Sequence, residues 1–530
     1  MSVLSSVQLV TAPGIFKNFN IKSEMNAKKF LTNNQNAMHK PCLDSVATEK
    51  SLIEFTINLM NQSGVDFGDL RLGRDFQKYI SLLNTNVTSS RLNSSAGIGL
   101  RILKSGFWGF SSTNDLTEGG ILKCVKRAVA MADAISAVTP AHLGTKMQNF
   151  AQEPAHNAEF HTPTEICPFE TATAIAAEPL RNSAEIALAI SGIKKVSAFI
   201  DCYGKRRWFA STQGARILTT HCVVNVEQII YAIDNGTSAY RTLISPGMAG
   251  GLEHFFAADF PSKAKNAAQE ALLKCKAPQP KAGQTDLILD GHHLALTIHE
   301  SVGHPTELDR VLGYELNMAG GSFASIDKLG KFKYGSPLVN LTADNRIKYG
   351  GASVGFDDEG VECQKFPIVS EGILAGFGTN RETAHRIGQK RANGTARATS
   401  WYDTPIVRIP NLYLEPGTKK LSLDELIVDT KNGILMMGRD SFSIDQYRYN
   451  FQFGADMCFQ IENGKVTHPL RDVIYQSITP DFWASCDAIC DESEWQMHGI
   501  FNCGKGEPGQ TAKMMHGASP SRFRNIQVGY

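Results

Sequence analysis

The chain has 530 residues, more than one hydrophobic core normally supports, so the sequence predicts two or more domains. Its 53 Lys and Arg side chains almost balance 52 Asp and Glu side chains, and 42% of its residues are hydrophobic. This composition is typical of a globular protein. The sequence shows neither basic clusters nor apolar runs of about 18 residues, so we expect no nucleic-acid partner and no membrane partner.

The 11 cysteines are an odd number and are scattered along the chain. A chain of this size needs no disulfide framework, so we expect a reducing compartment and therefore a cytoplasmic location. Residues 1–46 show no basic region leading into a long apolar run, so they do not predict a secretory signal. They also contain no Arg, which argues against a transit peptide, and we expect a poorly ordered extension.

The first elements are expected from about residue 47, where apolar residues at three- and four-residue spacing predict a helix. Short extended runs follow at 66–75 and 78–90. Residues 97–113 predict two strands joined by a hairpin at Lys104-Ser105-Gly106.

An amphipathic helix is expected next at 120–138. Helical sequence at 170–190 is interrupted by Pro179, which predicts a short turn and then a helix that starts at Pro179. Strands are expected after it at 194–212, 215–233 and 238–245. This half therefore predicts an α/β N-terminal domain over 47–283, with an antiparallel sheet and helices on one face.

The second half differs in pattern. Residues 244–253 hold three glycines and a proline, which is typical of a flexible loop, and 278–283 are a plausible boundary. Residues 284–530 contain short apolar runs with turn signals about every ten residues, which predicts a β-rich C-terminal domain. The two halves together place the chain in the α+β fold class.

One short string in the second half carries residue types suited to metal chemistry. His299 and His304 can offer neutral imidazole nitrogens to a metal, and the carboxylate of Glu300 can act on a water beside it. The usual zinc-peptidase helix spaces its histidines four apart, on one face. The spacing here is five, which separates the two side chains by about 140° on an ideal helix.

Two neighbours of His304 favour a distorted helix end that would overcome this separation. Gly303 loosens the backbone, and Pro305 disfavours the helical conformation of the residue before it. A helix that begins at about Gly291 is therefore expected to open, or to widen into a single π-type turn, at Ser301–His304. Such a turn could bring His304 back towards His299.

A catalytic zinc site needs about three protein ligands and one open position. Cys503 lies in a glycine-rich stretch at 502–506 whose exposed backbone could let a thiolate approach an ion, although an ordinary loop cysteine is the alternative. The residues alone leave the third ligand open among Glu307, Asp309, Cys458, Cys486, Cys490 and Cys503.

Three other motifs favour structural roles. Residues 351–355 match the Gly-x-Ser-x-Gly nucleophile pattern, but the following residues do not predict the helix that this pattern requires. The acidic run at 357–359 is expected to be a solvated turn, or a charge partner for Arg381 or Arg397. The pair His292-His293 is interpreted as structural, because His293 points away from the side of His299.

Several stretches in order resemble one known family. The run HESVGHPTELDRVLGYELNMAGGSF at 299–323 is similar to the signature of the TldD/PmbA family of metallopeptidases, on the TldD side. GIGLRIL, FASTQG, GFDDEGV, NGTARA, SIDQYRYNFQFG and NCGKGEPGQ are further similar stretches. The resemblance runs from about residue 50 to the C-terminus.

This resemblance implies a fold, a site and partners. It implies a two-domain protomer and dimers that enclose a central chamber, with unfolded or extended peptides as substrates. Carried over by position, the ligands of one zinc ion per active protomer are His299, His304 and Cys503, and Glu300 is the catalytic base. PmbA-type partners lack the histidine motif, so this chain is expected to be the active type. Residues 305–307 replace a glycine-rich continuation, which leaves open a homodimer or a heterodimer with a PmbA-like subunit.

The sequence therefore predicts a zinc-dependent metallopeptidase in which Glu300 moves the water proton to the leaving amine. We expect the substrate to bind as an extended strand along a sheet edge. Two alternatives keep the metal: a zinc amidase acting on small peptide-derived metabolites, and a non-catalytic, zinc-stabilised peptide-binding or assembly protein.

Overall fold

The computed structural model of the chain describes residues 46–139 and 150–529, so the extension expected at 1–46 falls almost entirely outside the described residues. The described chain mixes helices and sheets in an α+β fold, as predicted. No helix among the described residues is long and apolar enough to cross a membrane.

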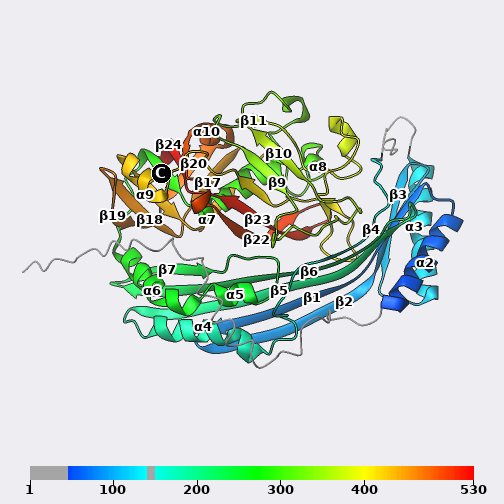
Figure 1. Cartoon of the computed structure of the whole chain (residues 1–530), viewed down its shortest axis with the longest axis horizontal. Helices are drawn as coiled ribbons and strands as arrows, with labels where there is room; N and C mark the ends of the chain where they lie inside the picture. The colour runs from blue at the N-terminus through cyan, green and yellow to red at the C-terminus, as the bar shows by residue number, and fades with distance from the viewer. Residues whose placement is uncertain (1–45, 140–149, 530) are drawn as a thin grey trace, which may run out of the picture. The chain divides into compact units, whose positions relative to one another are not determined.

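A seven-stranded sheet occupies the first half (Figure 1). Its order is β3-β2-β1-β5-β6-β4, with β7 also paired to β6, and every pair is antiparallel except β4 with β6. The runs expected to be short strands are instead parts of two strands of 17 and 19 residues, β1 and β2. The predicted hairpin is confirmed between β2 and β3, where Ser105 and Gly106 adopt positive φ. The strands are β1 (Phe67–Leu83), β2 (Asn86–Lys104), β3 (Phe107–Thr113), β4 (Asn157–His161), β5 (Ile193–Ser211), β6 (Arg216–Asp234) and β7 (Thr237–Ile244).

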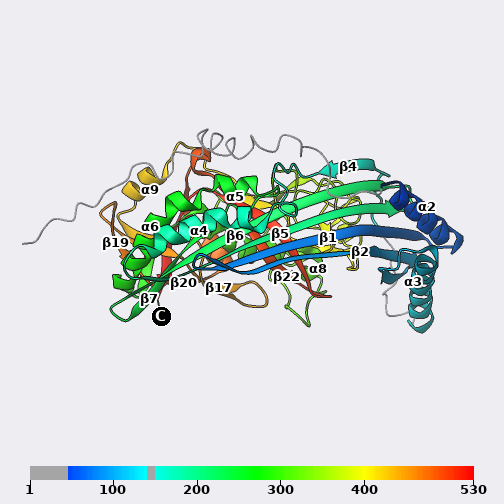
Figure 2. The same ribbon diagram turned by 90° about the horizontal axis from the view of Figure 1, so that it is seen from below.

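The two faces of this sheet have opposite chemistry. Even-numbered apolar side chains, such as Leu70 and Leu82 of β1 and Ile200 of β5, pack against the helices. Odd-numbered side chains include charged residues that face the second half: Arg101 pairs with Glu359, and Arg71 donates to the backbone carbonyl of Asp358. Figure 2 shows α4, α5 and α6 over the helical face, which confirms the predicted arrangement. The helices are α2 (Val46–Gln62), α3 (Glu118–Val138), α4 (Thr173–Leu188), α5 (Glu253–Ala257) and α6 (Phe260–Lys276).

One helix prediction was wrong. Pro179 does not begin a helix but lies inside α4, which starts at Thr173. The proline removes a single backbone donor, whereas buried side chains on both sides of it, including Ala176 and Leu180, pack against the sheet. Tertiary packing therefore carries the helix through the proline.

The second half is rich in short strands, as predicted. A nine-stranded sheet has the order β16-β17-β20-β24-β8-β15-β18-β19, with β21 paired to β24. Its strands are β8 (Gly283–Leu289), β15 (Asn432–Met437), β16 (Phe442–Ile444), β17 (Asn450–Gly454), β18 (Met457–Glu462), β19 (Lys465–Leu470), β20 (Ile474–Ile478), β21 (Cys486–Ile489) and β24 (Ser521–Val528).

A six-stranded sheet lies beside it, with the order β11-β10-β9-β14-β23-β22. Its strands are β9 (Leu341–Asp344), β10 (Lys365–Ser370), β11 (Ile373–Leu374), β14 (Leu412–Leu414), β22 (Gln496–Lys505) and β23 (Gln510–Ala518). A separate pair is β12 (Ala396–Arg397) with β13 (Ile406–Val407). The helices of this half are α7 (Gly291–Ile298), α8 (Leu308–Val311), α9 (Leu423–Asp429) and α10 (Thr479–Ala484).

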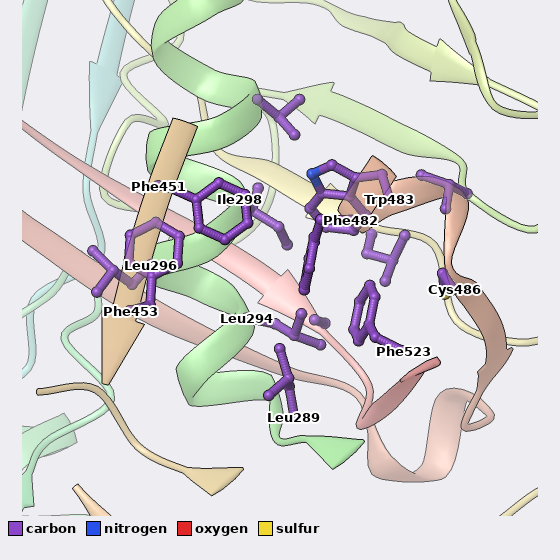
Figure 3. Packing of buried hydrophobic residues seen from close by; sticks show 14 of the residues in the cluster. Leu289, Leu294, Leu296, Ile298, Phe451, Phe453, Phe482, Trp483, Cys486 and Phe523 are labelled. Atoms are coloured by element: carbon purple, nitrogen blue, oxygen red, sulfur yellow. The ribbon is translucent and has the colours of Figure 1, made fainter. Parts of the chain in front are cut away.

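Helix α7 sits within the core of this half. Asp290 caps its start by accepting a hydrogen bond from the backbone N–H of His293, and the helix contacts β22 and β23. Figure 3 shows Leu294 and Ile298 of α7 among aromatic side chains that include Phe482 and Phe523, whose rings stack at 4.1 Å. The end of α7, where the metal motif begins, is therefore held in a close-packed environment.

The strands of the seven-stranded sheet lie within residues 67–244, and those of the other sheets lie within 283–528. The domain boundaries at 47–283 and 284–530 stay a prediction.

Candidate metal centre

The distortion predicted after α7 is confirmed. Residues His299–Gly303 form a π-type turn, and His304–Thr306 form a 3-10 turn. The backbone N–H of His304 donates to the carbonyl of His299, five residues back. Because a π turn closes on the fifth residue, both imidazoles lie on one side, with ring centroids 4.9 Å apart. The turn begins at His299, two residues earlier than expected.

Gly303 packs closely within this turn. A Cβ on Gly303 would meet side-chain carbons of Ile409 at 2.9 Å, so a larger residue would have to displace Ile409 or the turn. The φ of Gly303 is −60°, which any residue adopts, so its role here is close packing rather than backbone freedom.

Cys503 lies on β22, next to a register shift between β22 and β23, and reaches the two histidines from 199 residues further along the chain. One ligand atom from each of His299, His304 and Cys503 lies within 4.8 Å of the other two. The thiol sulfur is 3.5 Å from Nε2 of His304, and all three side chains are buried. Among the described residues, no group of this kind includes Cys458, Cys486 or Cys490.

Hydrogen bonds behind the histidines set the direction in which each ring can bind. Nδ1 of His516 lies 3.0 Å from the carbonyl of Leu412, so it must carry a proton and donate. Nε2 of His516 is then an acceptor for Nδ1–H of His299, at 2.9 Å. Nδ1 of His304 likewise donates to Glu307, at 2.8 Å. Both rings are left with a lone pair on Nε2, the atom available to a metal.

The charge states suit a soft divalent cation. Burial lowers the pKa of His299 to about 4, and lowers that of His304 well below its usual range, so both rings are neutral. Burial alone would raise the pKa of the Cys503 thiol, but His304 and the Arg408 guanidinium outweigh burial and hold it below its usual range. Arg408 Nη2 donates to the sulfur at 3.0 Å. Two neutral imidazoles and a thiolate are a donor set that fits zinc.

The remaining acidic candidates for the third ligand have other roles. Glu307 accepts from His304 and lies 3.3 Å from Lys505, and Lys505 also pairs with Asp309 at 2.5 Å. Both carboxylates are therefore compensated behind the centre rather than pointing into it.

Glu300 follows His299 in the π-type turn, is buried, and forms an ion pair with Arg448 through Oε2. Arg448 lies between β16 and β17 and adopts a positive φ of 63°. It falls within the family-like stretch SIDQYRYNFQFG, which is a sequence signal for its importance. No local signal in the sequence indicated Arg408 or His516.

Two of the competing motifs can be followed directly. Ser353 of the Gly-x-Ser-x-Gly stretch donates to the carbonyl of Ile347 and lies within hydrogen-bonding distance of Asn411, in a segment without a helix. His293 contacts the Gly438 carbonyl and the Tyr475 hydroxyl in the core, as expected of a structural histidine.

The expectation of a solvated turn at 357–359 was wrong. All three acidic residues are buried, because the turn faces the charged side of the seven-stranded sheet. Asp358 pairs with Arg207, and Glu359 pairs with Arg101 while accepting the backbone N–H of Arg381. The charge partners come mainly from the first half of the chain rather than from Arg381 or Arg397.

Comparison with known proteins gives consistent matches along most of the chain. The model of the PmbA/TldA metallopeptidase C-terminal domain matches residues 282–529, and that of PmbA/TldA metallopeptidase domain 1 matches residues 68–132. A metalloprotease of Methanocaldococcus jannaschii is 30% identical over 83% of this chain and 92% of its own length. A zinc metalloprotease TldD homolog of Saccharolobus solfataricus is 23% identical over 89% of this chain and 98% of its own.

Solved structures match in fold. TldE from Thermococcus kodakarensis has a TM-score of 0.67 and covers 91% of this chain and 100% of its own, at 16% identity. A protein of Thermotoga maritima has a TM-score of 0.70 with the same coverage and identity. These similarities in structure establish the shared fold.

Proposed function

Because the chain belongs to the PmbA/TldD family of metallopeptidases, we propose that it is a zinc-dependent peptidase that hydrolyses unfolded or extended peptides. The observation that carries the proposal is the approach of His299, His304 and Cys503 to within 4.8 Å, with the buried carboxylate of Glu300 beside them. We assign these three residues as the ligands of one zinc ion and Glu300 as the general base.

Zinc bound there would act as a Lewis acid on the scissile carbonyl. The protein's own residues supply the proton transfers. Arg448 holds Oε2 of Glu300, so we assign Oε1 as the atom that takes the proton of the attacking water and gives it to the leaving amine. His516 and Glu307 keep the two imidazoles in the tautomer that leaves Nε2 free.

The substrate is proposed to lie along the edge of β22. This strand ends the order of the six-stranded sheet, and among the described strands it pairs only with β23. It also carries Cys503. A peptide added to this edge would be held by backbone hydrogen bonds close to the candidate metal centre. Cleavage restricted to one residue type would contradict this mode of binding.

Glu300→Gln is the test of the assigned chemistry. The amide keeps the shape of the side chain but cannot act as a base, so we expect zinc content to stay stoichiometric while peptide cleavage falls by about 10²- to 10⁴-fold. Metal analysis and hydrolysis of an unfolded protein and of short peptides measure the two effects. Glu492→Gln, an exposed position, is the matched control and should change neither.

Two outcomes would contradict the proposal. Cleavage by Glu300→Gln at the wild-type rate would remove the general base. A zinc-loaded wild type that hydrolyses small amides but never peptides, or nothing at all, would favour the amidase or the non-catalytic alternative.

We further propose that the chain works as a dimer, either with itself or with a PmbA-like subunit. The support is its likeness in fold to TldE, at a TM-score of 0.67. Mass measurement of the purified chain alone, and after mixing with a PmbA-like protein, distinguishes the two.

A further inference from the structure

A second site lies on the other face of β23. A cavity of about 510 Å³ is lined there by β1, β2, β5 and β6 of the seven-stranded sheet, by residues 397–402 and by 511–513 of β23. We call it the cationic cavity, after the three cations in its lining: Lys205, Arg397 and Lys513.

These cations lack hydrogen-bonded carboxylates. Lys513 Nζ lies 3.8 Å from the ring centroid of Tyr203, and its hydrogen-bond contact is the Thr511 hydroxyl at 3.5 Å. Lys205 Nζ is 3.8 Å from Asp358, beyond hydrogen-bonding distance. Within the described part of the chain, neither lysine donates to a carboxylate. Both lysines are half-buried, so their ammonium groups keep some contact with water.

Arg397 is the third cation, and its relative exposure is only 6%. Its two terminal nitrogens donate to the backbone carbonyls of Lys513 and Ile409, both at 2.6 Å. Its Nε is buried and has no hydrogen-bond partner among the described residues. The guanidinium lines the cavity and has no hydrogen-bonded carboxylate within the described part of the chain.

The carboxylates nearest to the cavity are already engaged. Arg207 binds Asp75, which also lines the cavity, at 2.8 Å and binds Asp358 at 3.2 Å. Asp201 is held by hydrogen bonds from Gln77 and Tyr203. Burial lowers the pKa of Lys513 to about 8, and the charges of Arg408 and Arg397 add to this shift.

We propose that the cationic cavity binds a small molecule that carries a carboxylate or phosphate group, held by Lys205, Arg397 and Lys513. Its volume is within the range of small-ligand sites. Hydroxyl and amide side chains complete the lining and suit a polar remainder of the ligand: Gln77, Asn93, Ser94, Ser95, Ser400 and Tyr402. This site goes beyond the proposed peptidase chemistry.

The alternation of β23 separates this ligand from the candidate metal centre. Met514 packs in one cluster with Cys503, and His516 bonds to His299, so these even-numbered side chains face the centre. Thr511 and Lys513 alternate with them and line the cavity, and Ala512 lines it too, so the cavity adjoins the candidate metal centre. The proposed anion is a ligand separate from the peptide at the centre.

The test measures anion binding to the zinc-loaded full chain. Inorganic phosphate and succinate are titrated separately by calorimetry, at constant ionic strength set with sodium chloride. We expect saturable binding of at least one, and Lys513→Met is expected to weaken it by about 10- to 100-fold, as for loss of a hydrogen bond between charged groups. Lys195→Met is the matched control, because Lys195 also lies over a tyrosine ring, at 4.7 Å from Tyr231, but is exposed.

Melting curves separate binding from folding. Lys513→Met removes a half-buried cation that has no hydrogen-bonded carboxylate, so without added anion it should melt at or above the wild-type temperature, and the anion should no longer raise its melting point. If Lys513→Met melts below the wild type, the same titration is repeated with Lys205→Met, which should also weaken anion binding. Binding of phosphate alone identifies a phosphate ligand, and binding of succinate identifies a carboxylate ligand.

The proposal is overturned by any of three results. The first is that neither probe binds saturably to the wild type. The second is that Lys513→Met and Lys205→Met bind as well as the wild type. The third is that Cys503→Ala removes the binding, which would place the anion at the candidate metal centre.

Discussion

The two faces of β23 carry groups of opposite chemistry: electron-pair donors on one face and cations on the other. On one face, His299, His304 and Cys503 converge within 4.8 Å as electron-pair donors, and the groups behind them are paired. On the other face, Lys205 and Lys513 line a cavity without a hydrogen-bonded carboxylate, and Lys205 has only a longer ion pair with Asp358, at 3.8 Å. One strand thus separates a place suited to a metal cation from a place suited to an anion.

The difference shows which buried polar groups indicate function. Asp69, Arg71 and Arg101 are also buried, but their charges are balanced among themselves and by Glu359, so this cluster joins the two halves, although Nε and Nη2 of Arg71 find no hydrogen-bond partner among the described residues. A site is indicated where metal-ligating atoms converge, or where charge remains after the ion-pair partners among the described residues are counted. Both faces of β23 meet that criterion, with opposite sign.

The largest expected effect is a loss of zinc affinity at the candidate metal centre, with the cationic cavity left intact. Cys503→Ala removes the proposed thiolate ligand, so zinc affinity should fall by more than the 10- to 100-fold typical of outer-shell partners. Lys513→Met, on the opposite face, should keep stoichiometric zinc. Equilibrium dialysis followed by metal analysis measures both.

Cys486→Ala is the matched control for this loss. Cys486 is also buried and was a candidate ligand from the sequence, but it lies in the hydrophobic core, where burial raises the pKa of its thiol to about 12. It should retain zinc. If Cys503→Ala keeps its zinc while Cys486→Ala does not, the assignment of ligands is wrong.

A smaller effect is expected from the residue that fixes the tautomer of His299. His516→Leu removes the acceptor for Nδ1–H of His299, so zinc affinity should fall by about 10- to 100-fold. His516→Gln keeps an acceptor oxygen and should restore much of the affinity. Competition with a chelator of known affinity provides the values.

A merely structural role for His516 would give another pattern. Both substitutions would then lower the melting temperature of the zinc-free protein and leave the affinity of the folded protein for zinc unchanged. His293→Gln, in a buried histidine remote from the three candidate ligands, should leave the affinity at the wild-type value.

Structural features that depend on residues close together in sequence were predictable. Gly303 and Pro305 adjoin His304, and the π-type turn that they predicted is present. Helices α2 and α3 followed from periodicity, whereas packing carried α4 through Pro179. Local chemistry decides such features, so a single sequence contains them.

The remaining parts depend on residues far apart in sequence. His516 is 217 residues from His299, and Arg448 is 148 from Glu300, so no local pattern marks either pair. The burial of 357–359 depends on arginines of the seven-stranded sheet in the same way. The cationic cavity likewise assembles only when β5 and β23 meet.

The smallest expected effect is the pH dependence of anion binding in the cationic cavity. Burial lowers the pKa of Lys513 to about 8; Asp201 opposes this shift, whereas Arg408 and Arg397 add to it, and Tyr203 lies beneath the ammonium. A lysine is charged below its pKa, so succinate should bind less tightly as the pH rises from 7 to 9, by up to about tenfold. Lys513→Met should flatten this profile.

The lowered pKa of Lys513 also determines how the stability of the anion-free protein changes with pH. The unfolded chain holds the Lys513 proton up to about pH 10.5, whereas the folded chain releases it from about pH 8, so stability should rise across this interval. Bound succinate favours the charged lysine and should oppose that rise. Denaturant unfolding with and without succinate measures both slopes, and equal slopes would mean that the anion does not meet Lys513 in the cationic cavity.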